Sequence, residues 1–117
     1  MTVWYADGSG WNGKESKVCI VERDELNQFN KHVYIIRFEY QLTNNEAEYY
    51  ALILALTKVK PNDEIRTFSQ LVLNQTSGEW RVNFPHLQRL CDIVRAIKPQ
   101  DVKISWEHDN QADKILK

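Results

Sequence analysis

The sequence lacks a surplus of charge of either sign. Among 117 residues there are 15 Lys and Arg against 16 Asp and Glu, which gives a formal net charge of -1. This balance excludes the strongly basic overall field by which many proteins attract nucleic acid. If the protein binds nucleic acid, local geometry must provide the attraction.

Cysteines and long apolar runs are also scarce. The two cysteines, Cys19 and Cys91, lie far apart in apolar surroundings, so we expect buried free thiols rather than a zinc site. No apolar run reaches the length of a membrane span, and the first residues lack the charged and apolar regions of a signal peptide. We therefore expect an intracellular, cytoplasmic protein that does not associate with membranes.

What is present is the composition of one globular domain. Hydrophobic residues make up 43% of the chain and charged residues 26%, which is typical of a packed fold. A chain of 117 residues can bury a sizeable core but has no room for a second one. The sequence predicts a single domain over residues 1–117.

The hydrophobic pattern predicts strands that alternate late in the chain with helices. Strands are expected at residues 2–6, 17–22, 32–40, 64–68 and 102–106, and helices at 45–59, 69–75, 85–98 and 110–117. A polar connection is expected over residues 24–30, and turn residues at 7–10 are expected to end the first strand abruptly. The order βββαβααβα predicts an α/β fold with a five-stranded mixed sheet flanked by helices.

Three carboxylates stand at the predicted ends of elements: Asp7 at a strand end, and Glu48 and Asp113 at helix starts. Each has a structural explanation when taken alone. Asn45 as N-cap with Glu48 three residues later forms a capping box, and the helix dipole favours an acid such as Asp113 near a helix start. Together, carboxylates on three separate elements can converge to hold divalent cations, because Mg²⁺ prefers oxygen ligands. Phosphodiester hydrolysis is the natural chemistry of such a site.

These segments resemble the ribonuclease H family, in the family's order and over nearly the whole chain. Residues 5–9 resemble the first-strand motif with the family's first catalytic Asp, and residues 43–48 resemble the motif whose last Glu is catalytic. Residues 69–80 are similar to the family's compact form without a basic protrusion, and residues 106–113 resemble the terminal segment with a mobile His and the fourth carboxylate. The resemblance implies a ribonuclease H-like fold.

The resemblance also implies catalytic roles and a cofactor. Asp7 would bridge two Mg²⁺ or Mn²⁺ ions, and Glu48 and Asp113 would help hold the ion on the leaving-group side. His108 would assist proton transfer or product release.

The resemblance further implies a partner, an RNA/DNA hybrid duplex. Minor-groove contacts, where 2′-hydroxyls distinguish RNA from DNA, are implied for the amide side chains of Asn12, Asn44, Asn45 and Gln70. Thr43 would help receive a phosphate of the DNA strand. Neutral groups suit this task, because recognition depends on shape and 2′-OH groups while phosphate contacts only position the duplex.

The sequence departs from the family pattern at Phe68, where the family has an Asp immediately before Ser-Gln. A phenyl ring offers no oxygen to a metal ion, so the implied ion that activates water loses a ligand. Asp109 is a conceivable replacement. Asp63 and Glu64 would lie at the wrong end of the same predicted strand.

Two functions therefore stay open, and we expect a monomer in either case. The first is a metal-dependent endonuclease that degrades the RNA strand of RNA/DNA hybrids, weakened by Phe68. The second is a catalytically inactive domain of the same fold that binds RNA/DNA hybrid or double-stranded RNA. A purely structural module has little support, because it makes Asp7, Glu48 and Asp113 a coincidence.

Overall fold

The computed structural model describes residues 1–24, 26 and 29–117. Its elements are β1 (Thr2–Ser9), β2 (Ser16–Asp24), β3 (Asn30–Phe38), α1 (Asn44–Leu56), β4 (Glu64–Thr67), α2 (Gln70–Thr76), α3 (Pro85–Ile97), β5 (Lys103–Trp106) and α4 (Gln111–Leu116). The predicted order βββαβααβα is confirmed. The connection expected over residues 24–30 lies partly outside the described residues.

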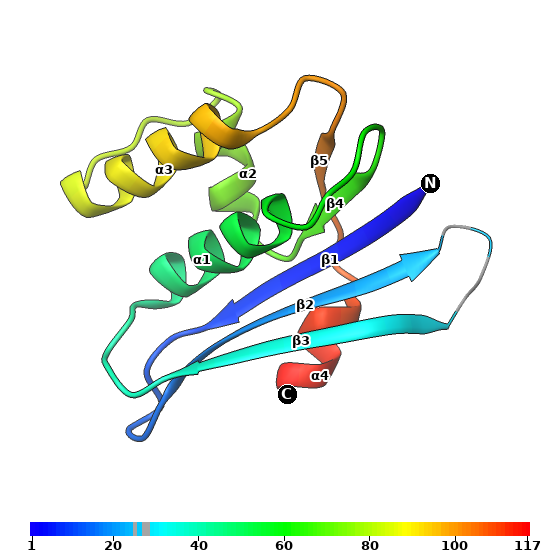
Figure 1. Cartoon of the computed structure of the whole chain (residues 1–117). Coiled ribbons are helices and arrows are strands. Elements are labelled where there is room, and N and C mark those ends of the chain that lie inside the picture. Colours follow the sequence, from blue (N-terminus) through cyan, green and yellow to red (C-terminus); the bar gives the residue numbers. More distant parts are fainter. Residues whose placement is uncertain (25, 27–28) are drawn as a thin grey trace.

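The five strands form one mixed sheet in the order β3-β2-β1-β4-β5 (Figure 1). β1 and β3 run antiparallel to β2, whereas β4 runs parallel to both β1 and β5. Because parallel strands end at the same edge of a sheet, β1, β4 and β5 bring their carboxyl ends together. Ala6 pairs with Thr67, and Thr67 pairs with Trp106, so Asp7 and Phe68 follow directly at this edge.

Helices cover the two faces of the sheet unequally. α1, α2 and α3 lie on one face, and the short α4 lies on the other (Figure 1). The main core lies under α1 and α3, where Ile20, Leu52 and Ile65 are fully buried. A smaller core under α4 contains Tyr5, Cys19 and Ala112, among others. The two-sided cover confirms the predicted α/β fold class.

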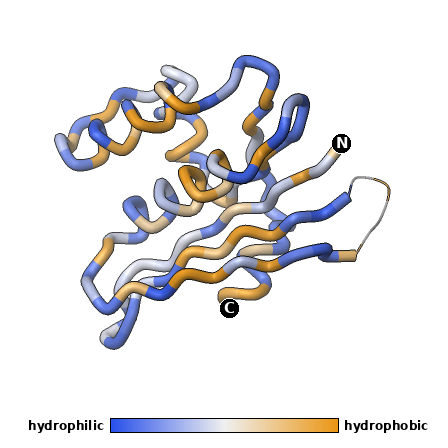
Figure 2. The backbone as a smooth tube through the Cα atoms, in the orientation of Figure 1, coloured by the Kyte–Doolittle hydropathy of each residue, from blue (hydrophilic) through white to orange (hydrophobic). Residues whose placement is uncertain are grey.

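Hydropathy along the chain agrees with these layers. Figure 2 shows hydrophobic residues concentrated along β2 and β3, and alternating with hydrophilic residues along α3. Cys19 and Cys91 are buried and free, which confirms the expectation of buried thiols. Within the described residues, no helix combines the length and apolar character needed to span a membrane.

The first strand is longer than the sequence predicts. β1 runs on through Gly8, which pairs with Val18, to Ser9, so the prediction of a turn starting at Asp7 was wrong. A steric requirement explains the glycine instead, because a Cβ on Gly8 would come within 2.2 Å of the backbone carbonyl carbon of Ala47 in α1. Gly8 therefore allows the strand and the helix to approach closely, which Cβ-bearing residues prevent.

The N-cap of α1 is Thr43, so the predicted capping box of Asn45 and Glu48 was wrong. The Thr43 hydroxyl accepts a hydrogen bond from the Glu46 amide at 3.1 Å, and the Glu46 carboxylate accepts one from the Thr43 amide at 2.9 Å. This reciprocal pair satisfies the helix start two residues earlier than predicted. Glu48 is therefore free to face β1.

Candidate functional site

A cleft of about 320 Å³ lies at the sheet edge where β1 and β4 end. Four elements or their flanks contribute to it, and its lining consists of Asp7, Gly8, Ser9, Asn44, Asn45, Glu48, Phe68, Ser69 and Asp113. The three predicted carboxylates are thus brought together from β1, α1 and α4. All three are nearly buried, with 5% of Asp7, 7% of Glu48 and 9% of Asp113 exposed.

Asp7 lies between the other two carboxyl groups. Burial raises the pKa of Asp7 to about 10, and hydrogen bonding and charge repulsion from Glu48, followed by Asp113, act in the same direction. Burial and like charges both disfavour an ionised carboxylate. The protonated form of Asp7 is therefore favoured over that of a free aspartate unless a cation compensates its charge.

Glu48 is fixed by the backbone of β1. Its carboxylate accepts a short hydrogen bond from the Gly8 amide, across the close approach that the glycine permits. Burial raises the pKa of Glu48, and the charge of Asp113 adds to this, while the hydrogen bonds from Asp7 and Gly8 oppose it. The site thus stores unfavourable carboxylate interactions that a divalent cation would relieve.

Asp113 depends on Asn110, a residue that the sequence reasoning missed. The Asn110 side-chain oxygen accepts hydrogen bonds from the Ala112 amide at 2.9 Å and the Asp113 amide at 3.3 Å, which makes Asn110 the N-cap of α4. Its Nδ2 donates to the Arg66 carbonyl at 3.0 Å. The preference of asparagine for N-caps is the sequence signal that would have found it. Asn110 thereby connects the helix that carries Asp113 to β4.

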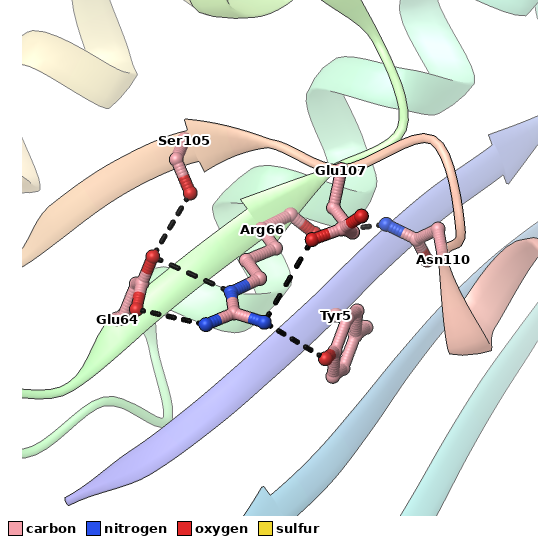
Figure 3. Close-up of polar contacts among 6 residues, drawn as sticks. All are labelled: Tyr5, Glu64, Arg66, Ser105, Glu107 and Asn110. Carbon is pink, nitrogen blue, oxygen red and sulfur yellow. Dashed lines mark hydrogen bonds and ion pairs between the residues drawn. The ribbon is translucent and has the colours of Figure 1, made fainter. Parts of the chain in front are cut away.

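A polar network on the α4 face of the sheet supports this connection (Figure 3). The Arg66 guanidinium donates to the Tyr5 hydroxyl at 3.1 Å and lies 3.8 Å from the Glu107 carboxylate. Arg66 also forms an ion pair with Glu64 at 3.4 Å, and Ser105 donates to Glu64 at 3.0 Å. β1, β4, β5 and the segment before α4 are therefore joined by side-chain contacts.

Phe68 lines the cleft at the position after the last Ala6–Thr67 pair of β1 and β4. Its ring stacks on His108, with centroids 6.0 Å apart and planes at 23°. His108 is exposed and is not among the residues that line the cleft. The predicted catalytic histidine thus packs against the phenyl ring that replaces a carboxylate.

Asp109 does not replace the missing carboxylate. It is not among the residues that line the cleft, and it forms an ion pair with Lys114, with an oxygen–nitrogen distance of 2.7 Å. That pairing lowers the pKa of Asp109 and keeps its charge exposed to solvent.

The structure brings only part of the predicted hybrid-binding set to the cleft. Asn44 and Asn45 line it, and Asn44 also accepts a hydrogen bond from the Gly10 amide at 2.8 Å. Asn12 instead closes the turn between β1 and β2 by accepting from the amides of residues 14 and 15. Gln70 is exposed on the first turn of α2. These two residues lie outside the cleft lining.

Thr43 lies at a second, smaller cavity of about 230 Å³ next to the cleft. Asn45 lines both cavities, and Phe84, His86 and Leu87 complete the smaller one. The two cavities therefore share one wall at the start of α1.

Comparison with known families identifies the chain. A sequence model of the reverse transcriptase-like family matches residues 7–113, a span that begins at Asp7 and ends at Asp113. The chain belongs to this family, which is ribonuclease H-like. A search of curated proteins found no match.

Solved ribonuclease H structures support this membership. RNase H1 from the halophilic archaeon Halobacterium salinarum is 28% identical with a TM-score of 0.81, over 92% of this chain and 86% of that one. LC11-RNase H1, solved in complex with an RNA/DNA hybrid, is 25% identical with a TM-score of 0.75 over 100% of both chains. The N-terminal RNase H domain of a Mycobacterium tuberculosis protein shares the fold, at 24% identity and a TM-score of 0.77 over 97% of this chain and 86% of that one.

The site of this ribonuclease H-like chain does not fit a two-metal centre. Among residues 1–24, 26 and 29–117, no group of three or more His, Cys, Asp or Glu side chains is arranged to hold a metal ion. Phe68 contributes no oxygen at the edge beside Asp7. The carboxylate oxygens of Asp7, Glu48 and Asp113 are nevertheless the type of donor that a hard divalent cation prefers.

Proposed function

We propose that this chain binds RNA/DNA hybrid duplexes across the cleft and cleaves the RNA strand weakly when a divalent cation is present. The observation that carries the proposal is the convergence of Asp7, Glu48 and Asp113 beside the amides of Asn44 and Asn45. A structural relative over the whole length of this chain, LC11-RNase H1, was solved with an RNA/DNA hybrid. The family and the donor set together favour phosphodiester hydrolysis over other reactions.

Hybrid binding would begin at the start of α1. Asn44 and Asn45 offer neutral donors and acceptors to 2′-hydroxyls and base edges in a minor groove. The exposed Thr43 stands beside them at the adjoining cavity, where a DNA-strand phosphate would meet the positive end of the α1 dipole. Asn12 and Gln70 would contact the duplex further out. This arrangement explains how a chain of net charge -1 binds a polyanion.

A single Mg²⁺ or Mn²⁺ would be held by Asp7 with help from Glu48 and Asp113. When bound, such an ion polarises the phosphate and lowers the pKa of a coordinated water. Asp7 would release its proton on binding, because its pKa is raised by burial and by its carboxyl neighbours. His108, exposed at the rim, would assist proton transfer or release of the product. Phe68 leaves the nucleophile side without its carboxylate, so the proposed cleavage is slow.

The phenyl ring also favours a second function, hybrid binding without cleavage. Phe68 removes an oxygen ligand but leaves Asn44 and Asn45 in the cleft lining. Recognition and chemistry are therefore separable in this chain. Both functions predict binding, and only the first predicts metal-dependent cutting.

The test combines cleavage and binding on one labelled hybrid. Cleavage of the RNA strand is followed with Mg²⁺ or Mn²⁺, and binding is measured by fluorescence anisotropy in EDTA. We expect slow cutting by the parent protein, no cutting by Asp7→Asn, and hybrid binding by both. Asp92→Asn, at an exposed position on α3, serves as the matched control and should cut like the parent.

Other outcomes would change the assignment. If the parent and Asp7→Asn cut equally, the cutting comes from a contaminating nuclease. Binding without any metal-dependent cutting would establish the second function. Failure of the parent to bind the hybrid at all would reject both.

A further inference from the structure

Three aromatic side chains lie next to one another at the rim of the cleft. Phe68 follows β4, Trp106 ends β5, and His108 lies in the segment before α4. The ring centroids of Phe68 and His108 are 6.0 Å apart at 23°, and those of Trp106 and His108 are 5.9 Å apart at 43°. We call Phe68, His108 and Trp106 the aromatic platform.

The backbone of the sheet edge holds the platform in place. The Trp106 indole nitrogen donates to the Phe68 carbonyl at 3.0 Å, and the Phe68 amide donates to the Ala6 carbonyl at 3.0 Å. The indole is therefore fixed to the strand that carries the phenyl ring. Rings held in advance lose little conformational entropy when a ligand stacks on them.

The platform is accessible as well as ordered. Trp106 is 39% exposed, His108 is exposed, and Phe68 is only partly buried. Phe68 belongs at the same time to the lining of the cleft that contains Asn44 and Asn45. A ligand on the platform would thus adjoin a duplex bound in the cleft.

We propose that the aromatic platform binds an unpaired nucleobase next to the RNA/DNA hybrid. The inference rests on the proposed hybrid binding and adds a substrate class to it: hybrids with a single-stranded extension or bulge. Inside a regular duplex each base is covered by its neighbours, whereas an unpaired base offers its ring face to aromatic side chains. An aliphatic residue at position 68 would fill the same space, but it would provide no ring face for stacking.

The experiment compares three substrates that share one hybrid duplex. One is blunt, one carries a short single-stranded RNA extension, and one carries an extension of the same length made of abasic nucleotides. The abasic extension has the same phosphates, so it controls for the electrostatic gain of a longer strand. Dissociation constants are measured by fluorescence anisotropy in EDTA, where no cleavage occurs.

We expect the extension with bases to bind at least about fivefold more tightly than the abasic one, because each base stacked on an aromatic side chain contributes about that much or more. Phe68→Leu keeps the apolar volume and removes the ring, so this ratio should fall towards one. Tyr40→Leu is the matched control, since Tyr40 is an aromatic residue 57% exposed on the connection after β3. The ratio should stay at its parent value in Tyr40→Leu.

Failure of the platform and failure of the proposed function give different results. Binding of all three substrates with a ratio near one in the parent would overturn the platform and leave hybrid binding standing. A preference for the base-containing extension without binding of the blunt hybrid would overturn the proposed function and leave the platform standing. An unchanged ratio in Phe68→Leu would overturn the role of the phenyl ring. Should that variant fail to fold by circular dichroism, Trp106→Leu tests the platform through its indole ring, and an unchanged ratio in Trp106→Leu would overturn the platform.

Discussion

Asp7 and Phe68 occupy matching places on two neighbouring parallel strands. Each follows directly on the Ala6–Thr67 pair of β1 and β4, and each lines the same cleft. Asp7 meets two further carboxyl groups and has its pKa raised to about 10. Phe68 meets the ring of His108 and carries no charge.

The comparison shows that strand pairing fixes where the side chains of Asp7 and Phe68 lie, but not whether they are charged or apolar. The Asp7 side is costly to fold, because burial and like charges oppose its ionisation. The Phe68 side is stabilised by ring packing and costs nothing in charge. Functional sites commonly retain such unfavourable groups. The predictions below test how the residues on each side affect the rate of cleavage and the free energy of unfolding.

The largest effect is expected from Phe68→Asp, which places a carboxylate after β4 as Asp7 does on β1. The variant supplies the missing oxygen ligand, so cleavage of an RNA/DNA hybrid with Mg²⁺ should rise by about 10²-fold or more. Asparagine has nearly the same shape as aspartate but no charge, so Phe68→Asn should cleave as slowly as the parent. Rates of RNA-strand cleavage by the two variants and the parent give the answer, and equal rates would show that Phe68 does not limit the chemistry.

The next effect concerns the close approach of β1 and α1 at Gly8, the residue after Asp7. Gly8→Ala places a Cβ within 2.2 Å of the Ala47 backbone, so we expect a loss of about 2–3 kcal/mol in the free energy of unfolding. Gly13→Ala is the contrasting variant: its φ of 96° is unfavourable for alanine, which is not so at Gly8, and no atom lies within 4 Å of the added Cβ. Urea denaturation should give Gly13→Ala the smaller loss. A loss below about 0.5 kcal/mol in Gly8→Ala would contradict the clash with the Ala47 backbone.

The third effect is a gain in stability from removing the Asp7 carboxylate. The folded-state pKa lies above the unfolded value of 3.8, so the folded protein binds more protons and its stability falls as pH rises from about 4 to about 10. Asp7→Asn cannot ionise, so at pH 8 it should be about 1–2 kcal/mol more stable than the parent. Below pH 4 the two should converge.

Urea denaturation in EDTA across this pH range measures the difference between the parent and Asp7→Asn. Titrating groups away from the site are common to both proteins, so the difference reports Asp7 together with Glu48, whose pKa depends on the hydrogen bond from Asp7. Parallel pH profiles would show that Asp7 is ionised at neutral pH without penalty.

The smallest effect separates the cap of α1 from the residues that face the cleft. Thr43→Ala removes the N-cap hydroxyl and should cost about 1 kcal/mol of unfolding free energy. Asn45→Ala should cost less than about 0.5 kcal/mol, because Asn45 is not the cap. Thermal or urea unfolding ranks the two variants. The opposite ranking would restore Asn45 as the cap and tie Glu48, the partner of Asp7, to the helix start.

Much of the fold could be predicted because its signals are local. Apolar alternation and helical spacing act over a few positions, and they predicted the correct order of elements. Motif spacing also identified the three carboxylates that the cleft collects.

The predictions were wrong or incomplete where the role of a residue depends on contacts that its neighbours in the sequence do not reveal. Gly8 looked like a turn residue, but its reason is Ala47, which lies on another element. Asn45 and Glu48 fitted a capping box, yet Thr43 and Glu46 form it, because the capping pattern occurs twice in overlapping registers. Asn110 carried a cap signal, but its hydrogen bond to Arg66 spans 44 positions and has no local trace.

The sequence by itself determined the set of elements, the apolar core positions and the replacement of one carboxylate by Phe68. Only the tertiary structure decided that Asp7 and Phe68 lie at one edge, that burial raises the pKa of Asp7, and that Phe68 joins His108 and Trp106 in one platform. The physical reason is the separation in sequence between the residues that interact. Propensity and periodicity act between neighbours in the chain, whereas pKa values and ring stacking depend on which distant strands the sheet pairs.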